Sequence, residues 1–507
     1  MINMFFKKNH KLEENKEVSK IVTENTITTQ KIKDILGKSS DVTFRRMNIN
    51  GNKNLSFSSV HINGMVDSLK ASEFILQPIL TNEVFKKSMT TEEIVKLIEE
   101  GSIYYASQTT RKDLNEVVKD VIDGSIAIIF DKENIAFTFD VKGFEHRSVS
   151  EPTSENVRKG GKDCFVEVLR VNTATIRRRI KTSSLVFEEK LVGEQSLTKI
   201  AIIYIDGITN VEIVDNVKKK IDEIHIDDLI SIGKLSEYIT EKKYSLFPMI
   251  DYTERPDKFC ADINEGRVGI IVDGLPLGVI VPAELAKFIQ APEDYSQDPI
   301  FSSLIRILRY ILVILTVVLP GLYVAITTFH SEMIPTELAI SIAQSKEGVP
   351  FPVFLEVIIM LIAFEVLVEA GLHLPRTIGQ AVSIVGALVV GEAAVNAKLI
   401  SPAVVIVIAA AAIASYTIPN QDLSNAIRVW RFIFVIFSSL AGLFGLYMGV
   451  ILLLFILARM ESFGIPYLVP YAGSKSKEIS DSFLRMPNYF NEKRPSFLKT
   501  YNKKRQG

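Results

Sequence analysis

The feature that most constrains this chain is a change of composition near residue 300. The residues before it are rich in Lys, Glu and Asp, whereas residues 304–460 are mostly Ile, Leu, Val, Ala, Gly and Phe. A chain of 507 residues is also too long for one ordinary domain. We therefore expect a soluble α/β N-terminal region followed by an all-α polytopic membrane domain.

A helix needs about 20 apolar residues to cross the roughly 30 Å of hydrocarbon in a bilayer. Residues 301–460 contain enough apolar stretches to predict a membrane domain with four spans, which lie near 307–328, 377–397, 399–418 and 429–458. The last stretch is long enough to tilt or project from the bilayer. Pro320 in the first span is tolerable, because membrane helices satisfy the freed carbonyl group locally.

The apolar stretch at 353–370 is harder to assign because it carries Glu356, Glu365 and Glu369. A carboxylate at the bilayer centre costs on the order of 3 kcal/mol on insertion scales. Helical spacing puts Glu365 and Glu369 on one face and Glu356 nearly opposite. We expect an amphipathic helix that lies in the interface or packs inside the assembly without crossing the membrane.

Basic residues at both ends of this domain predict its orientation. Arg306 and Arg309 precede the first span, and residues 461–507 form a basic tail. Because segments rich in Lys and Arg stay in the cytoplasm, we expect both the N-terminal region and the tail there, with four crossings. Five crossings would place the basic tail outside, so that topology ranks second.

The polar region contains a pattern that occurs twice. HINGMVD at 61–67 resembles YIDGITN at 204–210, and DGSIAII at 123–129 resembles EGRVGII at 265–271. Both copies continue as a predicted β-hairpin. Because the spacing between the two glycines is nearly the same in each copy, we infer two repeated α/β units, with chance similarity as the alternative. The units are placed at 54–142 and 196–300.

The remaining polar segments are a predicted mobile tail at 1–53 and a basic connector at 143–195. The connector holds a loop with a glycine pair at 151–161 and a run of three arginines. We expect these arginines to contact another subunit. Binding of an anion in this region and a simple solvated helix face are the alternatives. The candidate contact residues are Arg177, Arg178 and Arg179.

No motif for catalysis, a cofactor or a metal occurs in the sequence. The six histidines are not spaced as metal ligands usually are. We expect Cys164 and Cys260 to be two reduced thiols. A net charge of −1 gives no general attraction to nucleic acid. The sequence therefore favours neither an enzyme nor a nucleic-acid-binding protein.

Several longer phrases occur in order along the chain. They are EPTSENVRKG at 151–160, NTATIRRRI at 172–180, DYTERPDKFCADINEGRVGIIVDGLPLGVIVP at 251–282, LPGLYVAITTFHSEMIPTELAISIA at 319–343, EGVPFPVFLE at 347–356, LPRTIGQAVSIVGALVVGEAAV at 374–395 and FGIPYLVPYA at 463–472. Together they resemble the A subunit of the GerA-type spore germinant receptors of Bacillus and Clostridium relatives. The similarity runs from about residue 55 to 472.

This resemblance implies a setting and partners. It implies a subunit of the spore inner membrane that assembles with a B subunit similar to amino-acid permeases and with a C subunit that is a lipoprotein. It also implies homo-oligomerisation into a nutrient-gated channel for monovalent cations that initiates germination. A non-conducting scaffold is the alternative. A transporter is disfavoured because the predicted spans do not pair as related halves.

If the chain forms a channel, the stretch 377–397 is the best candidate for lining it. One of its faces carries polar and small residues at helical spacing, Val390 could narrow the pore by dewetting, and a ring of Glu392 at the cytoplasmic end would concentrate cations. Close packing between helices is the alternative explanation of small residues. The candidate pore-lining residues are Gln380, Ser383, Ala387, Val390, Gly391 and Ala394.

Overall fold

The computed structural model describes residues 26–82, 84–85, 89–103, 105–143, 155, 160–241, 245–373, 391–472 and 481–505. The chain divides into two compact units, residues 1–144 and 145–507. The second compact unit contains one α/β unit, the apolar helices and the C-terminal tail.

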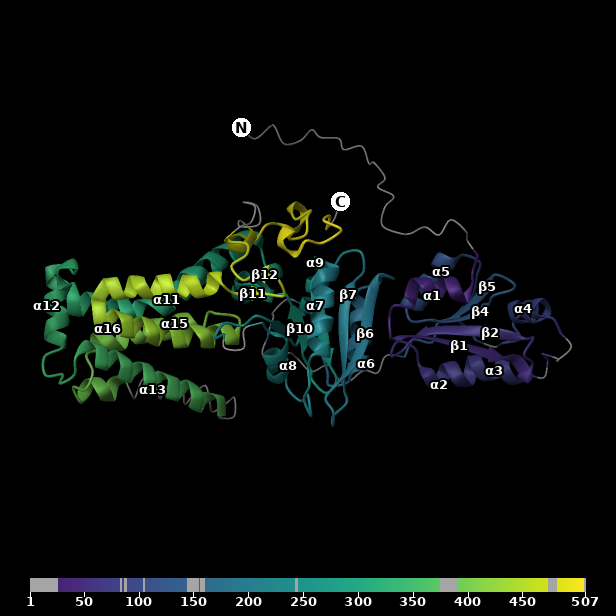
Figure 1. The fold of residues 1–507 in the computed structure, drawn as a ribbon, viewed down its shortest axis with the longest axis horizontal. Helices are drawn as coiled ribbons and strands as arrows, with labels where there is room; N and C mark the ends of the chain where they lie inside the picture. The colour runs from purple at the N-terminus through teal and green to yellow at the C-terminus, as the bar shows by residue number, and fades with distance from the viewer. Residues whose placement is uncertain are drawn as a thin grey trace, which may run out of the picture. The chain divides into compact units, whose positions relative to one another are not determined.

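The first α/β unit is a five-stranded antiparallel sheet with the strand order β1-β2-β4-β5-β3. A core of apolar side chains fills the side of the sheet covered by α3 and α4, and α1 and α5 lie on the other side (Figure 1). Its elements are α1 (Thr29–Leu36), β1 (Val42–Asn48), η1 (Ile49–Gly51), β2 (Ser56–Ile62), α2 (Ser68–Lys70), η2 (Ala71–Leu76), α3 (Gln77–Thr81), α4 (Thr91–Glu99), β3 (Gln108–Arg111), α5 (Leu114–Ile122), β4 (Ile126–Phe130) and β5 (Ile135–Phe139).

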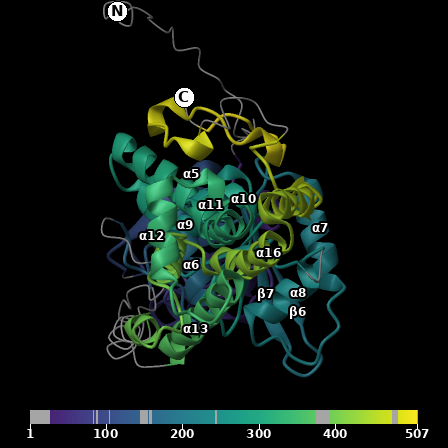
Figure 2. The same cartoon turned by 90° about the vertical axis from the view of Figure 1, so that its left-hand side faces the viewer.

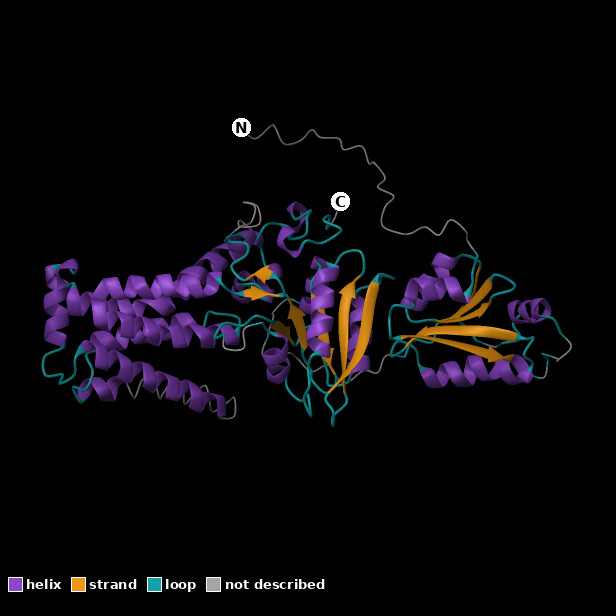
Figure 3. Ribbon diagram, in the orientation of Figure 1, coloured by secondary structure: helices purple, strands orange, loops and turns teal. Residues whose placement is uncertain are grey.

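The second α/β unit has the same architecture, with the strand order β6-β7-β9-β10-β8. The two sheets are drawn in orange in Figure 3. In this unit α7 and α8 pack on one face and α6 and α9 on the other. Its elements are α6 (Leu169–Arg179), β6 (Leu185–Val192), β7 (Thr198–Ile205), α7 (Val211–Asp222), α8 (Ile232–Ile239), β8 (Asp251–Thr253), α9 (Pro256–Glu265), β9 (Val268–Val272), β10 (Gly278–Val281), α10 (Leu285–Ile289) and η3 (Pro292–Tyr295).

The predicted repeat is therefore confirmed, and its glycines explain why the pattern recurs. Gly64 and Gly207 follow equivalent strands with φ of +83° and +78°. Gly124 and Gly266 follow equivalent helices with φ of +99° and +102°. Because only glycine adopts such angles without strain, the same turns require the same residue in both copies.

The predicted boundaries of the repeats were too narrow at their N-terminal ends. Within the described residues, 26–53 are not a mobile tail, because α1 and β1 already belong to the first sheet layers. Likewise α6 and β6 lie in the predicted connector but belong to the second sheet layers. Both helices are short, so their periodicity was too weak to separate them from loop.

The apolar region is a bundle of helices, which we call the helical bundle (residues 299–460). Its far end is the end most distant from the second α/β unit. There α12 lies across the other helices (Figures 1 and 2). Its elements are α11 (Pro299–Phe329), η4 (Ser331–Met333), α12 (Thr336–Ser345), α13 (Val353–His373), α15 (Pro402–Ser415) and α16 (Gln421–Ala458), together with a helical segment at 391–396.

The helix α13 runs along the bundle from the far end, parallel to α15. Val353, Val357 and Leu361 pack in one cluster with Ile400, Val404 and Ile408. A helix lies where one was expected at 353–370, and it packs inside the helical bundle. Residues 391–400 lie at the far end of the bundle, where Lys398 approaches Gly348.

The helix α16 is a hairpin rather than a straight span. Its backbone leaves helical geometry at Ala441 and Gly442. The carbonyl oxygen of Phe437 is the atom nearest to the position that a Cβ on Gly445 would take, and the ring of Phe434 lies 3.6 Å from the same position on Gly449. Contacts eight and fifteen residues apart require that the chain turn back. The predicted single span at 429–458 was therefore wrong.

The C-terminal tail is ordered on the second α/β unit over its described residues. It begins with β11 (Glu461–Ser462) and β12 (Ile465–Pro466) and continues with η5 (Asn488–Phe490) and η6 (Ser496–Leu498). The Ser462 hydroxyl donates to the carbonyl of Met249 at 2.7 Å, and the amide of Leu285 donates to the carbonyl of Tyr467 at 3.0 Å. The tail therefore returns to the end of the bundle from which α11 departs.

Candidate functional site

A charged cluster inside the helical bundle joins α13 to the first arm of α16. Arg431 donates to the Glu365 carboxylate at 2.8 Å, and Arg428 donates to it at 3.4 Å. Arg431 is 2% exposed and Glu365 is 30% exposed. Ionisable residues among apolar helices are expensive unless they are paired, and they commonly mark ion pathways or helix couplings. The cluster explains how a helix with this carboxylate packs in the bundle.

A second carboxylate, Glu356, is fully buried at the far end of the bundle. Its Oε2 accepts a hydrogen bond of 2.7 Å from the backbone amide of Ser401, the residue that precedes α15. The ammonium group of Lys346 lies 3.7 Å from Oε1. A negative charge at a helix N-terminus is stabilised by the free amides and the helix dipole. Glu356 therefore ties the start of α13 to the start of α15.

Four of the predicted pore-lining residues, Gln380, Ser383, Ala387 and Val390, lie outside the described residues. Of the other two, Gly391 is buried with Val405 3.3 Å from where its Cβ would be. Ala394 is half-buried against the cluster that contains α13 and α15. Within this chain these two small residues therefore serve close packing of helices.

Glu392 is exposed, as is Asn396 one helical turn further on. Both lie at the far end of the bundle, where Lys398 approaches Gly348 in the loop before α13. The sequence placed Glu392 at the same end as the α/β region. The structure places it at the opposite end, because residues 391–400 lie beside the start of α13.

The three arginines of the predicted subunit contact have different environments at the end of α6. Arg177 is fully buried and its guanidinium lies 4.7 Å from the centre of the Phe187 ring. Arg179 pairs with both oxygens of Asp163 at 2.5 Å, and Arg178 is exposed. Arg177 therefore stabilises the fold of the second α/β unit, and only Arg178 and Arg179 reach the surface.

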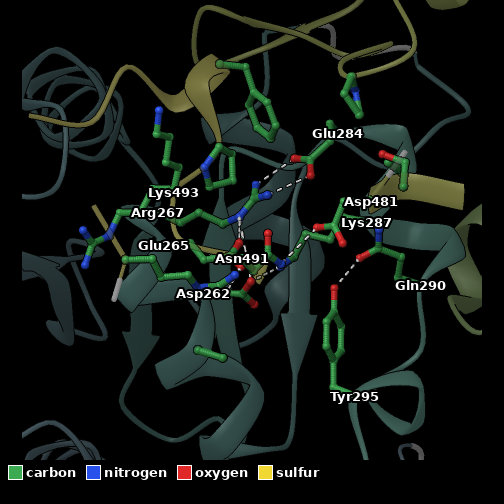
Figure 4. Close-up of a pocket in the computed structure, with 18 of the residues that line it drawn as sticks. Asp262, Glu265, Arg267, Glu284, Lys287, Gln290, Tyr295, Asp481, Asn491 and Lys493 are labelled. Atoms are coloured by element: carbon green, nitrogen blue, oxygen red, sulfur yellow. Dashed lines mark hydrogen bonds and ion pairs between the residues drawn. The ribbon is translucent and has the colours of Figure 1, made fainter. Parts of the chain in front are cut away.

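A large cavity of about 1630 Å³ lies between the second α/β unit and the tail (Figure 4). Arg267 forms two bonds of 2.7 Å to the carboxylate of Glu284, and Lys287 contacts Asp262. The walls of the cavity come from α9, α10, η3 and the tail. The labelled lining residues are Asp262, Glu265, Arg267, Glu284, Lys287, Gln290, Tyr295, Asp481, Asn491 and Lys493.

In this cavity ion pairing favours the charged forms of the side chains, whereas burial opposes them. Burial opposes the charge of Arg267, but Glu284 outweighs it and the pKa of Arg267 is raised. Burial raises the pKa of Glu265, and Arg505 at 2.7 Å partly offsets this. Buried ion pairs of this kind are costly to break, because one charge is left without its partner. The cavity walls therefore form a rigid polar joint between α9, α10 and the tail.

Sequence reasoning did not find these clusters. Glu365 and Arg431 are 66 positions apart, and Glu356 and Ser401 are 45 apart. A carboxylate and an arginine that both lie in apolar stretches are a signal that pairing is needed. That signal does not say which carboxylate meets which arginine.

The described chain thus consists of two α/β units that lead into an apolar helical bundle. By length and composition two described helices could cross a membrane, Pro299–Phe329 and Gln421–Ala458. The family model described as Bacillus/Clostridium GerA spore germination protein matches residues 30–497. The chain therefore belongs to the GerA family of spore germination proteins.

Several relatives are similar over nearly the whole chain. Spore germination protein KA of Bacillus subtilis is 37% identical over 472 residues, which is 93% of this chain and 86% of that protein. Spore germination protein B1 of the same organism is 35% identical over 465 residues, which is 92% of this chain and 95% of that protein. The crystal structure of the N-terminal domain of the A subunit of the Bacillus megaterium spore germinant receptor GerK3 aligns with 50% of this chain and 92% of that domain, at 29% identity and a TM-score of 0.40.

Proposed function

We propose that this chain is the A subunit of a nutrient-responsive germination receptor and that several copies form a channel for monovalent cations. Its partners would be a permease-like B subunit that binds the nutrient and a lipoprotein C subunit in the spore inner membrane. Family membership supports the germination role. The channel is supported chiefly by the segment 391–396, which exposes Glu392 and, one helical turn further on, Asn396.

The helix directions favour six crossings rather than four. The crossings would be α11, the span predicted at 377–397, α15 and the two arms of α16, together with α13, for which the sequence predicted no crossing. The helix α12 would lie at the opposite surface. An even number keeps the tail on the same side as the α/β units, as their contacts require. We place this side in the spore core.

The basic residues that suggested this orientation are occupied inside the protein. Arg309 bonds to Asp294 at 3.0 and 3.2 Å, and Arg306 lies 3.3 Å from the same carboxylate. Both are buried, so they fix the base of α11 on η3 and do not face lipid headgroups. The packing of the tail therefore supports the orientation more directly than these two charges do.

In a ring of copies, the exposed face of residues 392–396 would look toward a neighbour or toward the lumen. A ring of Glu392 would then sit at the mouth of the channel away from the α/β units, where it would concentrate cations. Ala387, which lies outside the described residues, precedes Glu392 by five positions in the span predicted at 377–397. This arrangement assigns attraction of cations to Glu392 and control of the width to residues near Ala387.

A scaffold without conduction is the second candidate. The specific observation in its favour is that Gly391 and Ala394 are used for packing on α15. The Glu365–Arg431 pair also holds α13 against α16, as a rigid scaffold would need. Channel and scaffold differ in whether a change on the 377–397 segment alters ion flow while the complex remains assembled.

The test is nutrient-triggered potassium efflux from spores, with all three subunits quantified. We expect Ala387→Trp to abolish efflux and Glu392→Lys to reduce it severalfold. Two matched controls should leave it unchanged: Ile406→Trp on the exposed face of α15, and Glu347→Lys at the same end of the bundle. Normal efflux from both test variants, at normal subunit levels, would refute the channel and favour the scaffold.

A further inference from the structure

The two α/β units differ in what covers one edge of their sheets. In the first unit the chain covers this edge itself, directly after β5. The amide of Gly143 donates to the carbonyl of Met65 at 3.1 Å, and the side chain of Lys142 lies 3.4 Å from where a Cβ on Gly124 would be. Lys142 also pairs with Asp123 at 2.8 Å.

In the second unit the chain cannot do this, because after β10 it turns into α10 and the helical bundle. Glu284 lies three residues after the end of β10 and pairs with Arg267, so it does not cover this edge. The equivalent edge is formed by Ile208, Gly266 and Glu265, which correspond to Met65, Gly124 and Asp123 in the repeat. Without another segment this edge would lack its cover.

The C-terminal tail supplies the missing contacts. The amide of Tyr501 donates to the carbonyl of Ile208 at 3.2 Å, as Gly143 does to Met65. Thr500, 3% exposed, provides the atom nearest to where a Cβ on Gly266 would lie. Arg505 pairs with Glu265 at 2.7 Å, as Lys142 does with Asp123. A backbone bond, a close approach to glycine and an ion pair therefore recur in both units.

We propose that residues 493–505 are an internal ligand of the second α/β unit and that the edge of Ile208, Gly266 and Glu265 is their binding site. The site recognises a segment with one free backbone amide, a small hydroxyl side chain and a basic residue a few positions further along the chain. The segment fills the place that residues 142–143 fill in the first unit.

Bonds within the tail itself help to shape it for this role. Arg494 donates to the carbonyl of Asn502 at 3.1 Å, and its amide donates to the carbonyl of Lys503 at 2.9 Å. These bonds close residues 494–503 into a compact loop, which lowers the entropy lost on docking. Leu498 is fully buried, and the guanidinium of Arg267 lies 5.9 Å from the ring centre of Phe497. The docked segment is thus held by apolar contacts as well as polar ones.

Docking gives the second α/β unit two attachments to the helical bundle. The chain leaves this unit through α10 and α11 and returns to it after α16 through the tail. Arg485 contributes at the same joint, because its amide donates to the Ser303 hydroxyl at 3.0 Å. A movement of either the first or the last helix would therefore reach the same α/β unit. This inference does not depend on ion conduction.

The test is cross-linking in the full-length chain, purified in detergent, with Cys164 and Cys260 replaced by serine. Glu265→Cys with Arg505→Cys should be joined in high yield within one chain by a short bis-maleimide. Lys219→Cys with Arg505→Cys is the matched control, because α7 lies on the other face of the sheet, and should give little product. A mixture of the two single-cysteine chains should give no dimer. Equal yields in both pairs, or cross-links only between chains, would overturn the proposal.

A second measurement does not depend on introduced cysteines. Tyr501→Pro removes the amide that bonds to Ile208, whereas Tyr501→Ala keeps it. We expect trypsin to cleave at Lys499 and Lys503 at least tenfold faster in the proline variant than in the alanine variant, with the rest of the chain equally resistant. Equal cleavage of the two variants would show that the tail does not dock through this bond.

Discussion

Replacing Gly442 by alanine distinguishes a hairpin from a straight helix in α16 by the sign of its effect. In a straight helix of 38 residues, alanine would be favoured over glycine by about 1 kcal/mol. In the hairpin Gly442 has φ of 58° and ψ of −137°, which residues with a Cβ rarely adopt. The two structures therefore predict opposite changes in stability.

The size of the loss follows from two terms. Forcing alanine into this backbone region costs about 1–3 kcal/mol. Its Cβ would also lie 2.8 Å from Phe329 Cβ and 2.8 Å from His330 Cε1, and overpacking of this kind costs about 1–3 kcal/mol. The free energy of unfolding should therefore fall by roughly 2–6 kcal/mol.

The assay is thermal unfolding of the full-length chain in detergent micelles. A loss of this size lowers the midpoint by about 4 °C or more in a domain of this scale. Gly449→Ala is the control, because this residue is helical and the Phe434 ring at 3.6 Å leaves room for a methyl group, so its midpoint should stay the same or rise by a few degrees. An unchanged or raised midpoint for Gly442→Ala would refute the hairpin.

Two further predictions concern a buried ion pair and the two thiols. Glu365→Gln should lower the free energy of unfolding by about 3 kcal/mol, because Arg431 loses its charged partner. Exchanging the two residues (Glu365→Arg with Arg431→Glu) should recover part of the lost stability. A single variant as stable as the original chain would contradict this. Burial raises the pKa of Cys164 to about 11 and that of Cys260 to about 12, so both are protonated at pH 8 and should react with iodoacetamide far more slowly than in the unfolded chain. For Cys164 the rate should rise steadily toward pH 11, and fast labelling at pH 8 would contradict its raised pKa.

The repeat could be read from the sequence because its signal is local. A glycine that must adopt positive φ is specified by its own turn, and Gly64, Gly124, Gly207 and Gly266 mark four such turns. The strands and hairpins beside them follow from short apolar runs. The helix α1 and strand β1 were missed because eight residues, as in Thr29–Leu36, carry too little periodicity to stand out from loop.

The change of composition near residue 300 determined that a polar α/β region precedes an apolar helical one. The sequence by itself also required partners for Glu356, Glu365 and Arg431, because charges among apolar helices must be paired. Only the tertiary structure decided which groups meet, which way α13 runs, and that α16 turns back at Gly442. Periodicity reports that a face is buried but not what buries it, so contacts between residues 45 to more than 200 positions apart, including the docking of the tail, emerge only when the chain has folded.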